Sequence, residues 1–277
     1  MKVASGINRP GAAIRITLFV LSAMVVVSPA QSAQTGKELP RVERAKRETD
    51  ARMKRLFAEK NLPFPPRKIL LQAFKKEKIL ELWCRQGDRI HFTLVRSYPF
   101  CRSSGVLGPK RRQGDLQIPE GVYHIDRFNP WSNFYLSLGI NYPNPSDRRR
   151  GNPKNPGGDI FIHGACVTIG CIPITTPKIK ELYWIAELAR QSGQRRIPVL
   201  IFPARMDEAN WAELKRTARD GRFWDAFKML TGKHHPHTPE ELIEFWQSLK
   251  QVFDYFEKYH SLPRVRIDGD GKYRIGA

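Results

Sequence analysis

The sequence predicts an α+β protein, in which a mainly β domain with flanking helices precedes a helical C-terminal extension. Between residues 67 and 128, short runs of branched and aromatic residues alternate with polar turns, a pattern typical of strands. Beyond residue 175 the apolar residues recur about every 3.6 positions, which indicates amphipathic helices. With 277 residues, of which 41% are hydrophobic, the chain can form one large core with additions.

Four segments are expected along the chain. They are a secretory signal peptide at 1–33, a charged peripheral helix and linker at 34–66, the mainly β domain at 67–206 and the helical extension at 207–277. The boundary near residue 66 rests on Pro63, Pro65 and Pro66, because proline lacks an amide hydrogen and disfavours helix in the residue before it.

The N-terminus has the layout of a secretory signal peptide. Lys2, Arg9 and Arg15 precede an apolar stretch at 16–27, and small residues at 28–33 offer a cleavage site. An uncleaved anchor is the alternative, but a membrane span needs about 20 apolar residues and this stretch is shorter. We therefore expect a periplasmic protein that contacts the membrane only through this segment.

The segment from 67 to 206 is expected to hold short strands at 69–74, 79–84, 90–95, 122–125, 135–140, 160–162 and 197–202. Those before residue 128 would form a β-meander. Glycine and proline recur between 105 and 121, and a long loop of this kind is often functional. Residues 141–158 have almost nothing to bury and should form a surface loop, with a lid as one reading.

Helical patterns follow the last cysteine. One helix should begin at Thr176 and Pro177, with the threonine as its N-cap. Another amphipathic pattern begins at Trp211, and Thr238 with Glu241 forms a capping box before a stripe of aromatic residues. This stripe is more typical of a core than of a ligand platform.

The net charge is the unusual feature of the composition. Against 27 Asp and Glu the chain has 47 Lys and Arg, a formal net charge of +20 that favours an anionic partner. Because the signal peptide predicts export, an anionic cell wall or outer envelope fits better than nucleic acid, which we do not expect as a partner.

The stretch from 159 to 175 carries the candidate chemistry. An apolar run at 160–162 leads to His163 and Gly164, and Gly170 leads into Cys171. A thiol needs a neighbouring base to become a strong nucleophile, and His163 is the nearest candidate in sequence. Backbone N–H groups around Gly170 and Cys171 could stabilise an oxyanion, since glycine lets a substrate carbonyl approach.

These residues carry a resemblance. His163-Gly164 followed by the segment from Thr168 to Ile172 resembles the active-site signature of the L,D-transpeptidases, the YkuD domain family, where a His-Gly pair precedes Ser/Thr-His-Gly-Cys. The spacing is shorter here, Ile169 replaces the second histidine and Pro173 replaces a polar residue. Stretches at 107–115 and 119–123 look most like the YafK-like murein L,D-transpeptidase branch, and the similarity covers roughly 67–206. It implies a YkuD-like β-sandwich.

The resemblance implies a reaction on peptidoglycan. Cys171 would attack the carbonyl of an L,D peptide bond in a stem peptide and form a thioester, which an acceptor amine or water would resolve. His163 would be the base, oriented by the Gly164 carbonyl, and the N–H groups of Gly170 and Cys171 would be the oxyanion donors. No metal or organic cofactor is implied.

Basic residues are candidates for substrate binding. Arg111, Arg148, Arg149 and Arg150 could meet the diaminopimelate carboxylates of the stem, although a solvated loop face is an equal reading for each. His124, within a strand pattern, could reach the cleft.

The 4 cysteines admit two readings. In an oxidising compartment two disulfides could form, but the enzyme reading requires Cys171 to stay free and leaves at most one bridge among Cys84, Cys101 and Cys166. The pattern does not choose which. No metal site is predicted, because His163, Cys166 and Cys171 lack the fourth ligand of a structural zinc site.

Two alternatives to peptidyl transfer stay open. A hydrolase of the same family would pass the thioester to water and cut links between murein and another envelope protein. A non-catalytic envelope-binding module would account for the charge of +20 and for Ile169 in place of a histidine.

Overall fold

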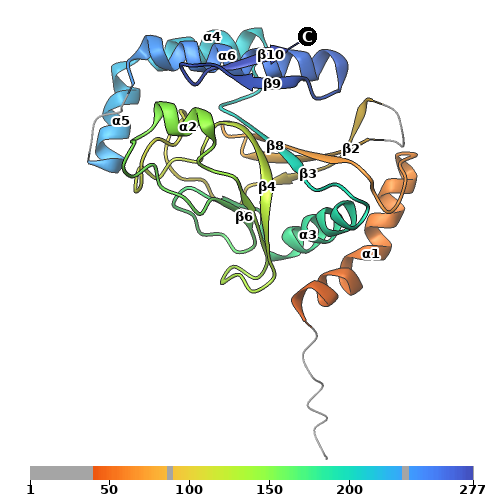
Figure 1. The fold of residues 1–277 in the computed structure, drawn as a ribbon. Helices are drawn as coiled ribbons and strands as arrows, with labels where there is room; N and C mark the ends of the chain where they lie inside the picture. The colour runs from red at the N-terminus through yellow and green to blue at the C-terminus, as the bar shows by residue number, and fades with distance from the viewer. Residues whose placement is uncertain (1–39, 86–89, 233–236, 277) are drawn as a thin grey trace, which may run out of the picture. The chain divides into compact units, whose positions relative to one another are not determined.

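The structure is a computed structural model that describes residues 40–85, 90–232 and 237–276 (Figure 1). The predicted signal peptide at 1–33 lies outside the described residues. These belong to one compact unit, Leu39–Ala277. Among them, no helix has both the length and the apolar character that a membrane span requires.

Eight strands form one curled mixed sheet in the order β3-β2-β1-β8-β4-β5-β6-β7. Their bounds are β1 Ile69–Phe74, β2 Ile79–Arg85, β3 Phe92–Pro99, β4 Gly121–Asn129, β5 Ser137–Ile140, β6 Phe161–His163, β7 Ile172–Pro173 and β8 Ile197–Phe202. The predicted α+β class is confirmed. All the strands of the mainly β domain are hydrogen-bonded into this single sheet.

The predicted meander is correct for β1, β2 and β3 and wrong beyond them. Strand β8 lies between β1 and β4, parallel to β1, with Leu71 beside Val199 and Phe74 beside Phe202. Nearly all of its residues are buried, as expected for a strand with neighbours on both sides. The strand pattern of the sequence does not reveal this insertion, because it specifies faces and not neighbours.

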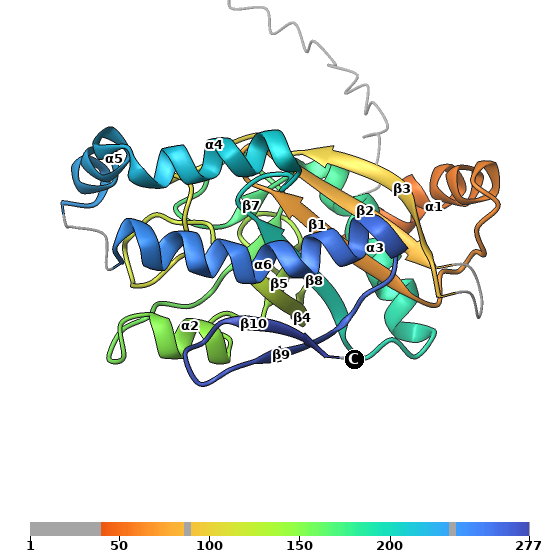
Figure 2. The ribbon, with the colours of Figure 1, turned by 90° about the horizontal axis from the view of Figure 1, so that it is seen from above.

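Six helices accompany the sheet in the described residues: α1 Arg41–Glu59, α2 Pro145–Arg150, α3 Thr176–Gln191, α4 Glu208–Arg219, α5 Gly221–Thr231 and α6 Pro239–Tyr259. Helices α1 and α3 lie on one side of the sheet, and α4 and α6 on the other (Figures 1 and 2). Helix α6 has the predicted capping box at Thr238 and Glu241. The N-cap of α3 is Thr175 rather than Thr176, and no side chain caps it.

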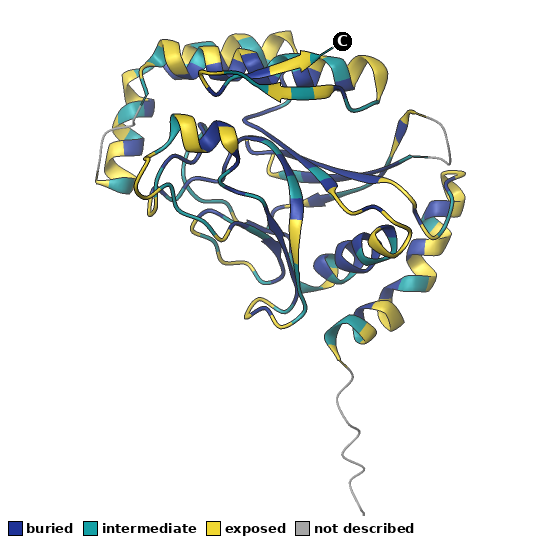
Figure 3. Cartoon of the chain, in the orientation of Figure 1, coloured by how far each residue is buried: buried dark blue, intermediate teal, exposed yellow. Residues whose placement is uncertain are grey.

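The C-terminal extension is not helical throughout. It ends in a hairpin of β9 (Arg264–Ile267) and β10 (Tyr273–Gly276), which packs near α6. It also shares a core with the sheet, where Phe253 contacts Phe74 and Phe202 with ring centroids 6.2 and 5.6 Å apart. Figure 3 shows the buried strands between the two helical layers, whose outer faces are exposed.

The prediction that residues 141–158 have almost nothing to bury is wrong. This stretch contains α2, where Asn144 and Asp147 form a capping box with Pro145 at the first turn. Asn144, Ser146 and Asp147 are buried. Asp147 accepts hydrogen bonds from Arg111 Nη1 at 3.1 Å and from the Tyr123 hydroxyl at 3.0 Å. Polar partners fix the stretch, and a search for apolar residues does not detect them.

Candidate active site

The pairing of β6 with β7 positions the two predicted reacting residues. The strands run parallel, with Ile162 beside Ile172 and His163 beside Pro173. Continuing this register by one residue places Cys171 beside Phe161, which is two residues before His163 on the neighbouring strand. The backbones of Cys171 and His163 are therefore about 8 Å apart. Thiol and imidazole therefore come from neighbouring strands, and no hydrogen bond joins them in this state. Such contacts often tighten only when substrate binds.

The Cys171 thiol is held by backbone groups. Its sulfur accepts a hydrogen bond from the Phe161 N–H at 3.4 Å and donates one to the Asp159 carbonyl at 3.6 Å. Burial raises the pKa of Cys171, and Asp159 adds to the rise, whereas the Phe161 N–H and the charge of Lys110 oppose it. The resting residue is therefore a thiol that must lose a proton to react.

His163 is suited to take that proton. The side chain is buried, and its Nδ1 is hydrogen-bonded to the Gly164 carbonyl, as predicted. A carbonyl only accepts, so Nδ1 carries the hydrogen and Nε2 is left as the basic nitrogen. Burial lowers the pKa of His163 and the bond to Gly164 only partly offsets this, so the imidazole is neutral near pH 7.

The loop before Cys171 is shaped by Thr168. Its hydroxyl donates to the Cys171 carbonyl at 2.7 Å and accepts from the Gly170 N–H at 3.1 Å. The Gly170 N–H, predicted as an oxyanion donor, is hydrogen-bonded to Thr168 in this structure. Of the predicted pair, the Cys171 N–H remains. Gly170 has φ +140°, and a Cβ there would lie 3.0 Å from the Gln117 carbonyl oxygen, so the backbone requires glycine.

Strained backbone surrounds the thiol. Asp159, Ala165 and Thr175 have φ values of 54°, 58° and 73°, in the left-handed region that non-glycine residues rarely adopt. Such residues persist where the surrounding structure over-determines them, and they cluster at functional sites.

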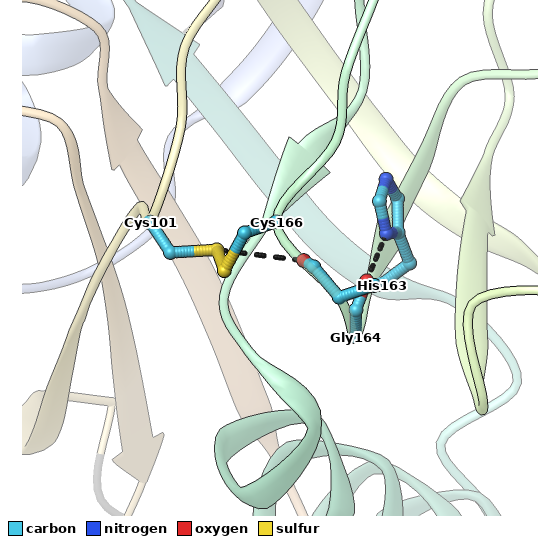
Figure 4. The surroundings of a disulfide bond; sticks show 5 residues. Cys101, His163, Gly164 and Cys166 are labelled. Atoms are coloured by element: carbon cyan, nitrogen blue, oxygen red, sulfur yellow. Dashed lines mark hydrogen bonds between the residues drawn. A yellow bond between two sulfur atoms is a disulfide. The ribbon is translucent and has the colours of Figure 1, made fainter.

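A disulfide crosses the same loop (Figure 4). Cys101 and Cys166 are bridged with Cα atoms 5.5 Å apart, while Cys84 and Cys171 are free. This agrees with the prediction of at most one bridge and a free Cys171. The Cys101 N–H also donates to the Pro173 carbonyl at 3.0 Å, which ties the second residue after β3 to β7. Cys101 therefore holds the stretch from His163 to Pro173 at two points, Cys166 through the disulfide and Pro173 through a backbone hydrogen bond.

Removing the bridge with Cys101→Ser/Cys166→Ser should lower both stability and turnover. The cysteines are 65 residues apart, and in the loop-entropy model closing such a loop contributes about 4 kcal/mol to the free energy of unfolding. Thermal unfolding measures the loss. A reductant should lower the melting temperature of the wild type only; equal shifts in both proteins would contradict a stabilising bridge.

Comparison with known proteins tests the resemblance. The family model for the L,D-transpeptidase catalytic domain, YkuD, matches residues 71–201. YafK from two Escherichia coli strains, K12 and O157:H7, is 35% identical over 209 residues, or 75% of this chain and 73% of that protein, and its own assignment as an L,D-transpeptidase is provisional. The chain belongs to the L,D-transpeptidase family.

Two solved structures are similar to this L,D-transpeptidase family member. The helical cell shape determining protein Pgp2 from Campylobacter jejuni is 17% identical, with a TM-score of 0.40 and coverage of 73% of each chain. Bd1075 from Bdellovibrio bacteriovorus is 22% identical, with a TM-score of 0.37 and coverage of 72% of this chain and 76% of that one.

Two of the four arginines predicted to bind substrate have structural roles in this L,D-transpeptidase domain. Arg111 is 1% exposed, pairs with Asp147 at 3.1 Å and lies 4.7 Å from the centroid of the Phe245 ring. Arg150 donates to the backbone carbonyls of Asp270 and Glu241. Both guanidinium groups fasten the domain to the C-terminal extension, and the burial of Arg111 contradicts the prediction that it contacts substrate.

The other predicted contacts remain candidates of unequal weight. Arg148 and Arg149 are exposed on α2 and can meet an anionic partner. His124 is half-buried, and burial together with Arg196 lowers its pKa while Asp126 opposes this. Within the described residues it makes no contact with Cys171 or His163, which argues against His124 as the base.

The sequence reasoning missed one side chain at the site. The Phe134 ring stacks on the His163 imidazole, with centroids 4.5 Å apart and planes at 28°. It lies in the irregular connection between β4 and β5, where no periodic pattern identifies it. By covering the imidazole, Phe134 contributes to the burial that keeps His163 neutral.

The site does not coincide with a cavity of about 690 Å³, which is lined among others by Arg85, Arg196 and Tyr255. The candidate site is defined instead by the Cys171 thiol and the His163 imidazole on neighbouring strands. Over the described ranges, no three His, Cys, Asp or Glu side chains are grouped to hold a metal ion.

Proposed function

We propose that the chain is a periplasmic cysteine L,D-transpeptidase that acts on peptidoglycan stem peptides through a thioester on Cys171. The observation that carries the proposal is a free thiol placed by β7 beside the strand that holds a buried, neutral imidazole. The Nδ1 of that imidazole is already committed to Gly164, which leaves Nε2 for proton transfer. Family membership supports the reaction class.

In the proposed first step, the Cys171 sulfur attacks the carbonyl carbon of the L,D peptide bond while its proton passes to His163 Nε2. The Cys171 N–H donates to the oxyanion. The C–N bond then breaks, and His163 returns the proton to the leaving amine. The products are a thioester on Cys171 and the released terminal residue.

In the second step, an acceptor amine attacks the thioester and His163 removes its proton. A new amide bond forms, and the Cys171 sulfur leaves and regains a proton. Water in place of the amine would give a shortened stem. The choice depends on whether the bound acceptor excludes water from the thioester.

Mass spectrometry of purified muropeptides incubated with the full chain tests the proposal. A new cross-link supports peptidyl transfer, and a trimmed stem supports the hydrolase. Unchanged muropeptides, with no carbapenem adduct on Cys171, would leave a binding module as the better account. The N-terminal mass of protein recovered from the periplasmic fraction tests both the location and the cleavage of the predicted signal peptide.

Binding to purified sacculi should weaken as salt is raised, because exposed charges more than roughly 8 Å apart are largely screened at physiological ionic strength. Turnover of a small soluble muropeptide should fall only modestly. Charge reversal of the exposed Arg148 and Arg149 separates the two roles, since a docking face loses only sacculus binding and a cleft wall also loses turnover. Binding that responds neither to salt nor to reversal would mean that the basic surface has another partner.

A further inference from the structure

The buried carboxylate of Asp115 organises part of the connection between β3 and β4. Asp115 is 1% exposed and accepts hydrogen bonds from Lys110 Nζ at 2.8 Å and from the backbone N–H groups of Arg111, Arg112 and Gln117 at 2.7, 3.0 and 3.1 Å. Its charged partner Lys110 is 4% exposed. A buried ion pair is costly unless its remaining groups are bonded, and here they are. The pair therefore holds a long turn-rich loop in one shape.

This pair lies against both segments that hold the thiol. The Gln117 carbonyl, two residues after Asp115, lies 3.0 Å from the position a Cβ would take on Gly170, immediately before Cys171. On the other side, the Lys110 Cε lies 3.0 Å from the corresponding position on Gly157. Gly157 is two residues before Asp159, whose carbonyl accepts the thiol hydrogen. The Lys110–Asp115 pair is thus packed behind the nucleophile.

The charges around Cys171 are few. Lys110 favours the thiolate, and Asp159 disfavours it. Asp159 has a side chain that is 81% exposed and pairs with Arg127 at 2.8 Å, so solvent and its partner screen it. His163 is neutral until it receives the thiol proton. Among the described residues, Lys110 is the buried basic side chain that favours the Cys171 thiolate.

We propose that Lys110 is a positioning residue for the nucleophile: paired with Asp115, it fixes the wall behind Gly170 and Cys171 and supplies the positive charge that stabilises the thiolate. The inference deepens the proposed function and rests on it, because it takes Cys171 as the reacting group. It also gives the turn-rich loop between β3 and β4 a definite role at the site.

A matched control is a second buried ion pair at this connection, in which Lys75, directly after β1, pairs with Glu120. Lys75 is also buried, at 5% exposed, pairs with Glu120 at 2.9 Å and donates to the carbonyls of Gly108 and Ile118. Lys75 is not among the groups that shift the pKa of Cys171. Lys75→Met should therefore cost stability without changing thiolate formation, whereas Lys110→Met should change both.

The experiment is the rate of iodoacetamide alkylation of Cys171 as a function of pH, read by peptide mass spectrometry. Cys84 does not compete, because burial raises its pKa to about 12. Lys110→Met should react roughly tenfold more slowly near neutral pH, because loss of a nearby positive charge raises the pKa of the thiol and about one pKa unit is a factor of ten in thiolate, and it should match the wild type in alkali. Lys110→Arg should stay close to the wild type.

Removal of Lys110 alone leaves Asp115 buried without its cation, so that variant can fail to fold. The double variant Lys110→Met/Asp115→Asn removes both charges, so no buried charge is left without its partner. It should show the same slow alkylation. A folded double variant with the wild-type profile would overturn the proposal. So would an equal shift in Lys75→Met, since it would indicate a general loosening of the loop.

The two hypotheses fail in different ways. An alkylation profile that does not depend on Lys110, together with an inactive Cys171→Ser, would overturn the inference and leave the proposed function standing. Turnover by Cys171→Ser would instead overturn the proposed function, whatever the alkylation profile shows.

Discussion

Cys171→Ser should abolish turnover of muropeptides, by roughly three orders of magnitude or more, as expected for loss of a covalent nucleophile. A serine hydroxyl at this position has only the His163 imidazole to activate it, and its far higher pKa leaves almost no alkoxide near pH 7. The free energy of unfolding should change by about 1 kcal/mol or less, because one sulfur becomes one oxygen without a large cavity. Turnover assays and chemical denaturation measure the two effects.

Cys84→Ser is the matched control, since Cys84 is the other free thiol and is fully buried in β2. A hydroxyl placed in that apolar position should cost stability and leave turnover intact. The two variants should therefore show opposite signatures. Near-wild-type activity in Cys171→Ser would contradict the thioester mechanism.

The fold could be predicted in those parts where the residue pattern and the local structure coincide. Strand β1 at Ile69–Phe74 and helix α6, with its capping box, have signals contained in their own residues. The insertion of β8 beside β1 depends on which buried strand meets which, and both read simply as apolar runs. Similarly, the β9–β10 hairpin is short and only partly buried, so its residues carry a weak alternation.

The same distinction applies to the site. The motif that predicts the site is short, because His163, Gly164 and Cys171 lie within nine residues of one another. The hydrogen bond from His163 to the Gly164 carbonyl joins neighbouring residues of this motif. Arg111 is different, because Asp147 and Phe245, far along the chain, determine that it is buried. A basic residue in a turn-rich stretch looks like a surface charge until its acidic partner is placed. Buried polar pairs are therefore what the sequence hides, and Lys110 with Asp115 is another example.

His163→Ala should lower turnover by roughly two to four orders of magnitude, the usual contribution of a general base. The thiol would then have to ionise without help, so alkylation of Cys171 should slow near neutral pH and recover in alkali. His124→Ala is the control and should leave the alkylation rate of Cys171 unchanged. If His163→Ala left the alkylation profile unchanged and His124→Ala shifted it, the base would be His124.

The pH dependence of the wild type follows from the sign of the shift at His163. Burial lowers its pKa below the usual 6.5, so the imidazole loses its proton at a lower pH than a free histidine does. The base is neutral and active above that point, and the acid limb of kcat/KM should lie below pH 6.5. Phe134→Leu removes the aromatic ring that stacks on the His163 imidazole, so the imidazole becomes more exposed. Less burial should raise the pKa of His163 towards its ordinary value and move the acid limb to higher pH. A limb that moves the other way, or stays in place while the protein remains folded, would show that a group other than His163 sets it.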